Sequence, residues 1–166
     1  MKGPFGGQLL AAVGRDGNNQ MYPIVWAMVE SDQTDNWSWF LQLLVDDLGS
    51  IDGRGFTLMS DQQKRLLNAI QNVWLGAKQR SCSRHVYANI RALHGVVEIR
   101  KCFWVIAKSS TTKRYEKSIE QMKKISILAI EDMVKRHPKR WCWAFFGVAL
   151  MIVLTTMWLK FSMHMF

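Results

Sequence analysis

The residue that first suggests chemistry is an aspartate at the end of a short apolar segment. Asp61 directly follows the strand-like run Phe56–Ser60, and an amphipathic helical pattern begins behind it. A carboxylate at the carboxyl end of a buried strand, with a helix starting behind it, commonly presents an oxygen ligand to a divalent metal ion. Aspartate is also a preferred helix N-cap residue, and caps far outnumber catalytic acids. The local pattern alone therefore favours a cap, with metal binding as the alternative.

Two further metal-ligand types stand close together at Cys82 and His85, in the order Cys-x-x-His. Thiolate and imidazole both bind zinc, but a structural zinc site needs four ligands, and no second pair follows at finger spacing. We therefore expect a local structural or active-site-flanking role for this pair, with His85 near the carboxyl edge of the sheet. The remaining cysteines, Cys102 and Cys142, are too scattered for a disulfide framework, which is typical of a reducing compartment. The other histidines are expected to be solvent-exposed or packing side chains: His94, His137 and His164.

The basic side chains are unevenly distributed along the chain. The net charge is +9, and it arises from −1 over residues 1–83 and +10 over residues 84–166. A surplus of this size is either solvated or matched by an acidic partner, of which the nucleic-acid backbone is the commonest. The basic residues that we select as candidate nucleic-acid contacts are Lys64, Arg84, Arg91, Lys113 and Arg114.

The elements that position Asp61 follow from the hydrophobic pattern. Residues 8–13 and 21–30 predict two strands, and the turn between them, rich in Gly and Asn, predicts an antiparallel hairpin. A helix is expected over residues 34–48, ended by Gly49. Residues 56–60 return as a strand that should run parallel to a neighbour, because a helix connects it to the earlier sheet. A second helix is expected directly after Asp61.

The second half of the chain is predicted to be helical. Residues 77–82 indicate a last short strand, and helical periodicity then covers residues 85–93, 102–108, 112–125 and 127–136. Glu120 and Lys124 are expected to form an i,i+4 ion pair. With 166 residues and 49% hydrophobic content, a disordered chain is excluded. The element order predicts an α/β fold: an incomplete RNase-H-like core, with an antiparallel hairpin plus parallel strands and helices, followed by an α-helical extension.

Five segments carry a resemblance to a known family: GGQLLAAVGRDGNNQMYPIVWAMVE, DNWSWFLQLLVDDL, FTLMSDQQKRLLNAI, CSRHVYANIR and RWCWAFF. In this order and spacing, they resemble the transposase domain of plant Mutator-like elements, almost continuously from Lys2 to Phe146. The resemblance implies a DDE enzyme that cleaves DNA and transfers strands at terminal repeats in the nucleus. In such an enzyme three carboxylates hold two Mg²⁺ or Mn²⁺ ions about 4 Å apart.

The resemblance also assigns individual residues. Asp61 matches the second acid of the family, which now favours a metal ligand over a cap. Cys82 and His85 match a Cys-x-x-His motif between the second and third acids. The first acid lies on a strand upstream of the family's KGPFGGQ segment, and we expect it to be absent from a chain that begins at Met1.

The third acid belongs to a motif C-D-x-x-x-N-N-x-x-E-x-F-N that should follow Phe146. This chain continues instead with GVALMIVLTTMWLKFSMHMF. We therefore expect only one of three metal-binding acids, no productively bound metal ion, and no cleavage or strand-transfer activity, because one carboxylate cannot hold two magnesium ions in the required geometry.

Two explanations stay open for this tail. Trp141 to Leu159 is a run of 19 uncharged residues behind Lys139 and Arg140, which satisfies the length and flank rules for a transmembrane helix. The alternative, which we prefer, is a frameshift or a misplaced exon boundary between residues 146 and 150. In the adjacent reading frame the nearly fixed codons of this segment require an Asp and allow the successive Asn residues and the Glu of the family motif.

The predicted organisation is a partial RNase-H-like transposase core over residues 1–83, a helical extension of the transposase domain over residues 84–146, and an aberrant hydrophobic tail over residues 147–166. The leading hypothesis is a catalytically inactive transposase fragment that keeps DNA affinity and is nuclear. One alternative is a transposase-derived transcription regulator of the far-red-impaired type. The other is a small single-span membrane protein, located in a membrane through its tail. Self-association is a further open expectation.

Overall fold

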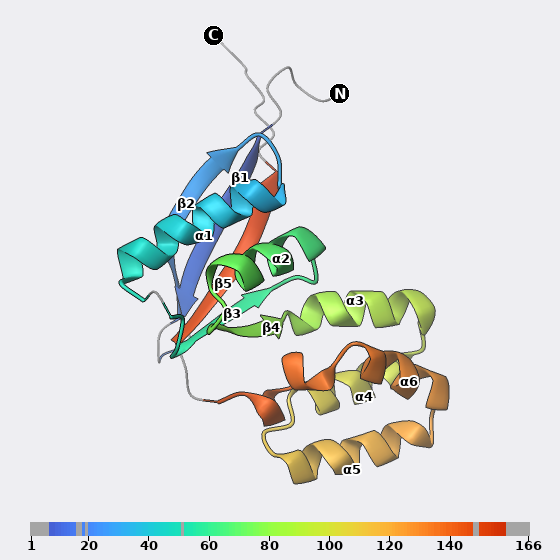
Figure 1. The fold of residues 1–166 in the computed structure, drawn as a ribbon. Helices are drawn as coiled ribbons and strands as arrows, with labels where there is room; N and C mark the ends of the chain where they lie inside the picture. Colours follow the sequence, from blue (N-terminus) through green and yellow to red (C-terminus); the bar gives the residue numbers. More distant parts are fainter. Residues whose placement is uncertain (1–6, 16–17, 19, 51, 148–149, 159–166) are drawn as a thin grey trace. The chain divides into compact units, whose positions relative to one another are not determined.

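The structure is a computed structural model that describes residues 7–15, 18, 20–50, 52–147 and 150–158. The chain divides into two compact units, drawn in Figure 1. Unit 1 combines the chain up to Gln79 with the residues from position 149 onward, and unit 2 spans Arg80–Val148. Unit 1 is therefore discontinuous in sequence, since unit 2 lies between its two segments.

A mixed sheet of five strands has the order β2-β1-β5-β3-β4 (Figure 1). The predicted hairpin is confirmed as the antiparallel pair β1 (Gln8–Arg15) and β2 (Met21–Val29). The predicted strands after it are β3 (Phe56–Ser60) and β4 (Lys78–Ser81). The central position belongs to β5 (Leu150–Trp158), which runs antiparallel to β1 and parallel to β3. The parallel neighbour expected for β3 is thus supplied by the end of the chain.

The described part of the apolar tail, for which a transmembrane helix was the alternative explanation, forms a strand instead of a helix. Trp143–Phe145 form one turn of 3-10 helix, and Leu150–Trp158 extend as β5. Ile152 and Leu154 are only 2% exposed. A strand in the centre of a sheet is a continuous apolar run, which hydropathy alone does not distinguish from a helix. No helix within the described part of the chain is long and apolar enough to cross a membrane.

Parts of the predicted tail lie outside the described residues, namely positions 148–149 and 159–166, which include His164. The amino-terminal segment 1–6 is outside them as well. The frameshift hypothesis concerns the coding sequence, so it stays a prediction.

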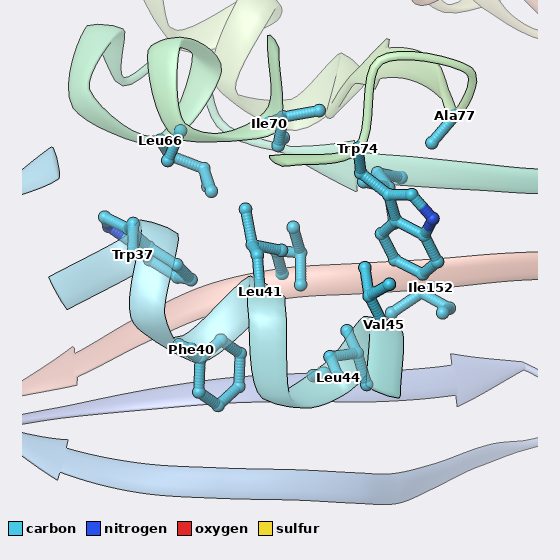
Figure 2. Close-up of a cluster of buried hydrophobic side chains, with 14 of the residues drawn as sticks. Trp37, Phe40, Leu41, Leu44, Val45, Leu66, Ile70, Trp74, Ala77 and Ile152 are labelled. Atoms are coloured by element: carbon cyan, nitrogen blue, oxygen red, sulfur yellow. The ribbon is translucent and has the colours of Figure 1, made fainter. Parts of the chain in front are cut away.

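Two helices cover one face of the sheet, α1 (Thr34–Leu48) and α2 (Lys64–Val73) (Figure 1). As predicted, α1 ends at Gly49, which adopts the left-handed conformation with φ 63°. Figure 2 shows the apolar side chains of α1 packed against those of α2 and against Ile152 of β5. The largest fully buried side chains of this core are Trp37, Trp74, Phe40, Leu10, Leu41, Leu44, Leu58, Leu66 and Ile70.

The turn that leads into β3 is fixed by the segment that follows α2. The indole of Trp74 donates a hydrogen bond to the carbonyl of Ser50 at 2.8 Å, and its ring centroid lies 5.2 Å from that of Phe56. Gly76 approaches this turn so closely that a Cβ on it would lie 1.9 Å from the carbonyl oxygen of Asp52. Only glycine fits there, and the start of β3 is thereby held against the end of α2.

Unit 2 contains the four predicted helices, α3 (Ser83–Leu93), α4 (Val97–Ala107), α5 (Thr112–Lys123) and α6 (Ile127–Lys135). The start of α4 differs from the expected Cys102, because its apolar face begins one turn earlier with Ile99, which packs beside Phe103. Phe103 stacks on Trp141 with ring centroids 5.1 Å apart. The expected pair of Glu120 with Lys124 is wrong: Glu120 pairs with Lys123 at 2.5 Å.

Arg80 joins the start of unit 2 to its last segment. Its guanidinium nitrogens donate hydrogen bonds to the carbonyls of Lys139 and Phe145. The guanidinium carbon also lies 4.6 Å from the ring centroid of Phe146, a cation–π contact. Burial lowers the pKa of Arg80 from its ordinary value. The side chain thus satisfies two backbone acceptors of a segment that has little regular structure of its own.

His94 has a defined partner, in contrast to the expectation for it. Its Nε2 lies 2.8 Å from Oδ2 of Asp132, which connects the end of α3 to α6. The hydrogen bond from His94, and next that from Lys135, hold the pKa of Asp132 below its ordinary value. The three cysteines carry free thiols, and burial raises the pKa of the Cys142 thiol.

Candidate functional site

Asp61 lies at the carboxyl end of β3, in the turn before α2. Its Oδ1 accepts a hydrogen bond from the backbone N–H of Gln63 at 3.3 Å. The hydroxyl of Ser60 donates to the backbone carbonyl of Asp61 at 2.8 Å. The N-cap residue of α2 is Gln63, and the helix begins at Lys64 rather than directly after Asp61. Asp61 is therefore not the helix cap; its carboxylate stabilises the turn that precedes the helix.

A second carboxylate, which the sequence did not single out, lies beside this turn. Asp32 accepts hydrogen bonds from the side-chain amide of Gln63 and from Nη1 of Arg65, the latter at 2.8 Å. Gln63 therefore contacts Asp61 through its backbone and Asp32 through its side chain. Asp32 is located between β2 and α1, 31 positions before Gln63. No local motif marks a contact over such a separation.

The strand next to β3 at this edge of the sheet is β5. Met59 of β3 is the parallel register partner of Val153. The register of this pair ends at these two residues, and Asp61 lies two positions beyond it, after the end of β3. None of the nine residues of β5, LMIVLTTMW, is an acid. The central strand thus brings no carboxylate to this edge of the sheet.

A two-metal centre needs several carboxylates that converge on the same two ions. Within the described residues, no group of three or more His, Cys, Asp and Glu side chains is placed to hold a metal ion. Asp32, which contacts the same turn through Gln63, already pairs with Arg65. The residues that the structure describes therefore do not fit the Mg²⁺ or Mn²⁺ centre that the resemblance implies.

Cys82 and His85 lie in the first turn of α3. Cys82 is its N-cap residue, and its carbonyl accepts hydrogen bonds from the backbone N–H groups of His85 at 3.0 Å and Val86 at 3.1 Å. The Cys82 side chain is half-buried, whereas His85 is exposed. The Cys-x-x-His motif thus coincides with a helix start, and the described residues add no further ligands that would make it a zinc site.

The five candidate nucleic-acid contacts are all exposed, but they belong to different units. Lys64 begins α2 in unit 1. Arg84 and Arg91 lie on α3 in unit 2, seven positions apart and thus on one helix face. Lys113 and Arg114 lie in the first turn of α5, also in unit 2. None of the five takes part in an ion pair found among the described residues.

Comparison with known proteins gives one family. The model of the MULE transposase domain matches residues 2–89, which is slightly more than half of the 166 residues. The match contains the hairpin, α1, β3, α2, β4 and the first part of α3, and therefore Asp61, Cys82 and His85. No curated protein matches the chain.

Proposed function

Because the chain belongs to the family of MULE transposase domains, we propose that it is a transposase-derived domain that binds DNA without cleaving it. Asp61 is the proposed descendant of the second acid in the DDE chemistry of this family. In that chemistry Mg²⁺ or Mn²⁺ ions activate the attacking oxygen and stabilise the leaving one. The proposal separates the two parts of transposase function, DNA contact and phosphodiester chemistry, and assigns only the first to this chain.

One observation carries the proposal: the strand between β1 and β3 is β5, and it brings no acid to the edge where Asp61 lies. A lone carboxylate, with the nearby Asp32 paired to Arg65, cannot neutralise charge on both sides of a phosphorus atom. Asp61 itself engages the backbone of Gln63. We infer that its present role is to shape the turn before α2.

We also propose the RNase-H-like class for unit 1. An antiparallel hairpin at one side, a parallel pair β5–β3 beside it, and helices that connect the strands on one face support this class. In this arrangement the carboxyl ends of β3 and β5 meet at the same edge of the sheet, because the two strands are parallel. That edge is where acids would have to converge.

The experiment combines binding and cleavage in one sample. Purified chain is incubated with fluorescently labelled duplex DNA in Mg²⁺ and, separately, in Mn²⁺; binding is followed by anisotropy, and the same samples are then run on a denaturing gel. We expect saturable binding and intact DNA. Metal-dependent cleavage or strand transfer that disappears in Asp61→Asn would contradict the assignment, and so would the absence of any binding.

A transposase-derived regulator of transcription remains the second candidate, since it too would bind DNA without cleaving it. It differs in requiring sequence preference. Competition of labelled duplex by random-sequence and by selected DNA separates the two: equal competition supports the inactive transposase domain, whereas a marked preference supports the regulator. Nuclear location is proposed for both candidates.

A further inference from the structure

The positive charge of this protein is concentrated in unit 2. Arg80–Val148 contain 15 basic and 5 acidic residues, so unit 2 carries +10, whereas the rest of the chain carries −1. Two of the five acids are already engaged within the unit, Glu120 by Lys123 and Asp132 by His94 and Lys135. The uncompensated surface charge of unit 2 is therefore large.

Helix α5 presents part of this charge as a row. Its buried side is formed by Ser118 and Met122, which are 5% and 0% exposed. Lys113, Lys117 and Lys124 are exposed. At 100° per residue they fall within about 40° of one another, on the side of the helix opposite Ser118 and Met122. Lys124 continues the helix geometry with φ −69° and ψ −22°. We call these three residues the α5 row.

The lysines of the α5 row make no ion pair that the structure describes, although one acid lies on the same side of the helix. Glu120 lies close to the row, but its carboxylate pairs with Lys123 at 2.5 Å. Glu116, the other acid of α5, projects about 60° to the side of Lys113. No ion pair found among the described residues includes a member of the row. The helix rises by about 6 Å from Lys113 to Lys117 and by about 10 Å from Lys117 to Lys124. The three cations are thus available to an external anion.

The first turn of α5 adds a second observation. Lys113 and Arg114 occupy it, and the turn contains no acid. Cations near a helix N-terminus are unfavourable, because they oppose the helix dipole. The helix is capped instead by the hydroxyl of Thr111, which accepts from the N–H of Arg114 at 3.2 Å. An anionic partner would offset this unfavourable placement.

We propose that the α5 row, together with Arg114, contacts the phosphate backbone of duplex DNA irrespective of base sequence. The inference rests on the proposed function and adds to it the surface through which the DNA is held. The row spans about 16 Å of helix. A duplex presents one charge per about 3.4 Å of axis on each strand, so the row can follow several successive phosphates. Lysine and arginine suit such contacts because they bind phosphate without distinguishing bases.

The test compares two triple variants that remove the same charge from different units. One replaces the α5 row (K113Q, K117Q and K124Q), and the control replaces three exposed cations of unit 1 (R54Q, K64Q and K78Q), which include the Lys64 candidate. Binding of a random-sequence duplex is measured by anisotropy over a series of salt concentrations. Circular dichroism verifies that both variants keep their helix content.

We expect the α5 variant to lower the slope of log affinity against log salt by about 0.9 per lost contact, close to 2.7 in all, and the control to change it by less than one unit. Equal losses in both variants, or an unchanged slope in the α5 variant, would overturn the inference while leaving the proposed function standing. Failure of the wild-type chain to bind DNA would overturn the proposed function itself. Binding to vesicles of anionic lipid, but not to DNA, through the same lysines would assign the row to a membrane surface instead.

Discussion

Ile152 of β5 is the parallel register partner of Leu58 of β3, and both side chains are buried, with 2% and 0% exposure. The two residues come from positions 94 apart in the sequence, on either side of unit 2. They contribute to one core with the apolar faces of α1 and α2. The end of the chain is thus part of the structure of unit 1, and the consequences of this can be measured.

Truncation of the buried face of β5 should destabilise the protein. Leu154→Ala is expected to lower the free energy of unfolding by about 2–5 kcal/mol, because it removes buried apolar volume and leaves a cavity in the core. Thr155→Ala is the matched control, since Thr155 is exposed on the same strand, and it should change stability by less than about 1 kcal/mol. Urea unfolding followed by fluorescence measures both. Similar small effects in the two variants would show that β5 is not integral to the core.

The close approach of Gly76 to the turn before β3 gives a second prediction. Gly76→Ala places a Cβ 1.9 Å from the carbonyl oxygen of Asp52, so the backbone must shift, and we expect a loss of about 2 kcal/mol or more. Gly95→Ala serves as the control, because its nearest neighbouring atom would be 3.8 Å away. Thermal unfolding should show a lower Tm for the first variant only. An unchanged Tm for Gly76→Ala would contradict the contact.

Replacement of Arg80 should lower the stability of the protein even when the charge is kept. Lysine cannot reproduce the fork that donates to the carbonyls of both Lys139 and Phe145. Arg80→Lys is therefore expected to lose at least one of these two hydrogen bonds and to cost about 0.5–1.5 kcal/mol. Arg84→Lys, at an exposed position four residues later, should cost less than about 0.5 kcal/mol. Tryptophan fluorescence during urea unfolding compares the two, and equal midpoints would refute the role of Arg80.

The contact between His94 and Asp132 predicts how the stability of the protein changes at acidic pH. Because the pKa of Asp132 in the folded protein lies below its ordinary value of 3.8, its contribution is fully present above that value and is lost as the pH falls through the lowered pKa. Asp132→Asn lacks this contribution at any pH. The stability difference between wild type and variant should therefore shrink as the pH is lowered below 3.8. Urea midpoints over a pH series test this, and a difference that stays constant into that range would contradict it.

Most of the elements could be predicted because their signals are local. The hairpin follows from two apolar runs, β1 and β2, around a turn rich in Gly and Asn. The periodic apolar face of α1 with Gly49 behind it and the four helices of unit 2 follow from spacing within single segments. β5 could not be assigned from hydropathy, since a central strand and a membrane helix are both uninterrupted apolar runs. Its β-branched residues, Ile152, Val153, Thr155 and Thr156, were the available signal for a strand.

The candidate site was only partly predictable for a related reason. Asp61 was identified from its place at the end of a strand and from a family resemblance, but its bond to Gln63 depends on the conformation of the turn. The contacts of Asp32 with Gln63 and of His94 with Asp132 join residues 31 and 38 positions apart. No pattern within one segment encodes such contacts, because they arise only when separate elements pack together.

The central claim is that the edge of the sheet at Asp61 does not assemble a two-metal centre. Calorimetric titration of the chain with Mn²⁺ tests it most directly, with Asp61→Asn as the control. We predict closely similar titrations for the two proteins, without saturable uptake of two ions, because no further acids converge on Asp61 among the residues that the structure describes. Stoichiometric uptake of two Mn²⁺ ions that is lost in Asp61→Asn would contradict the account.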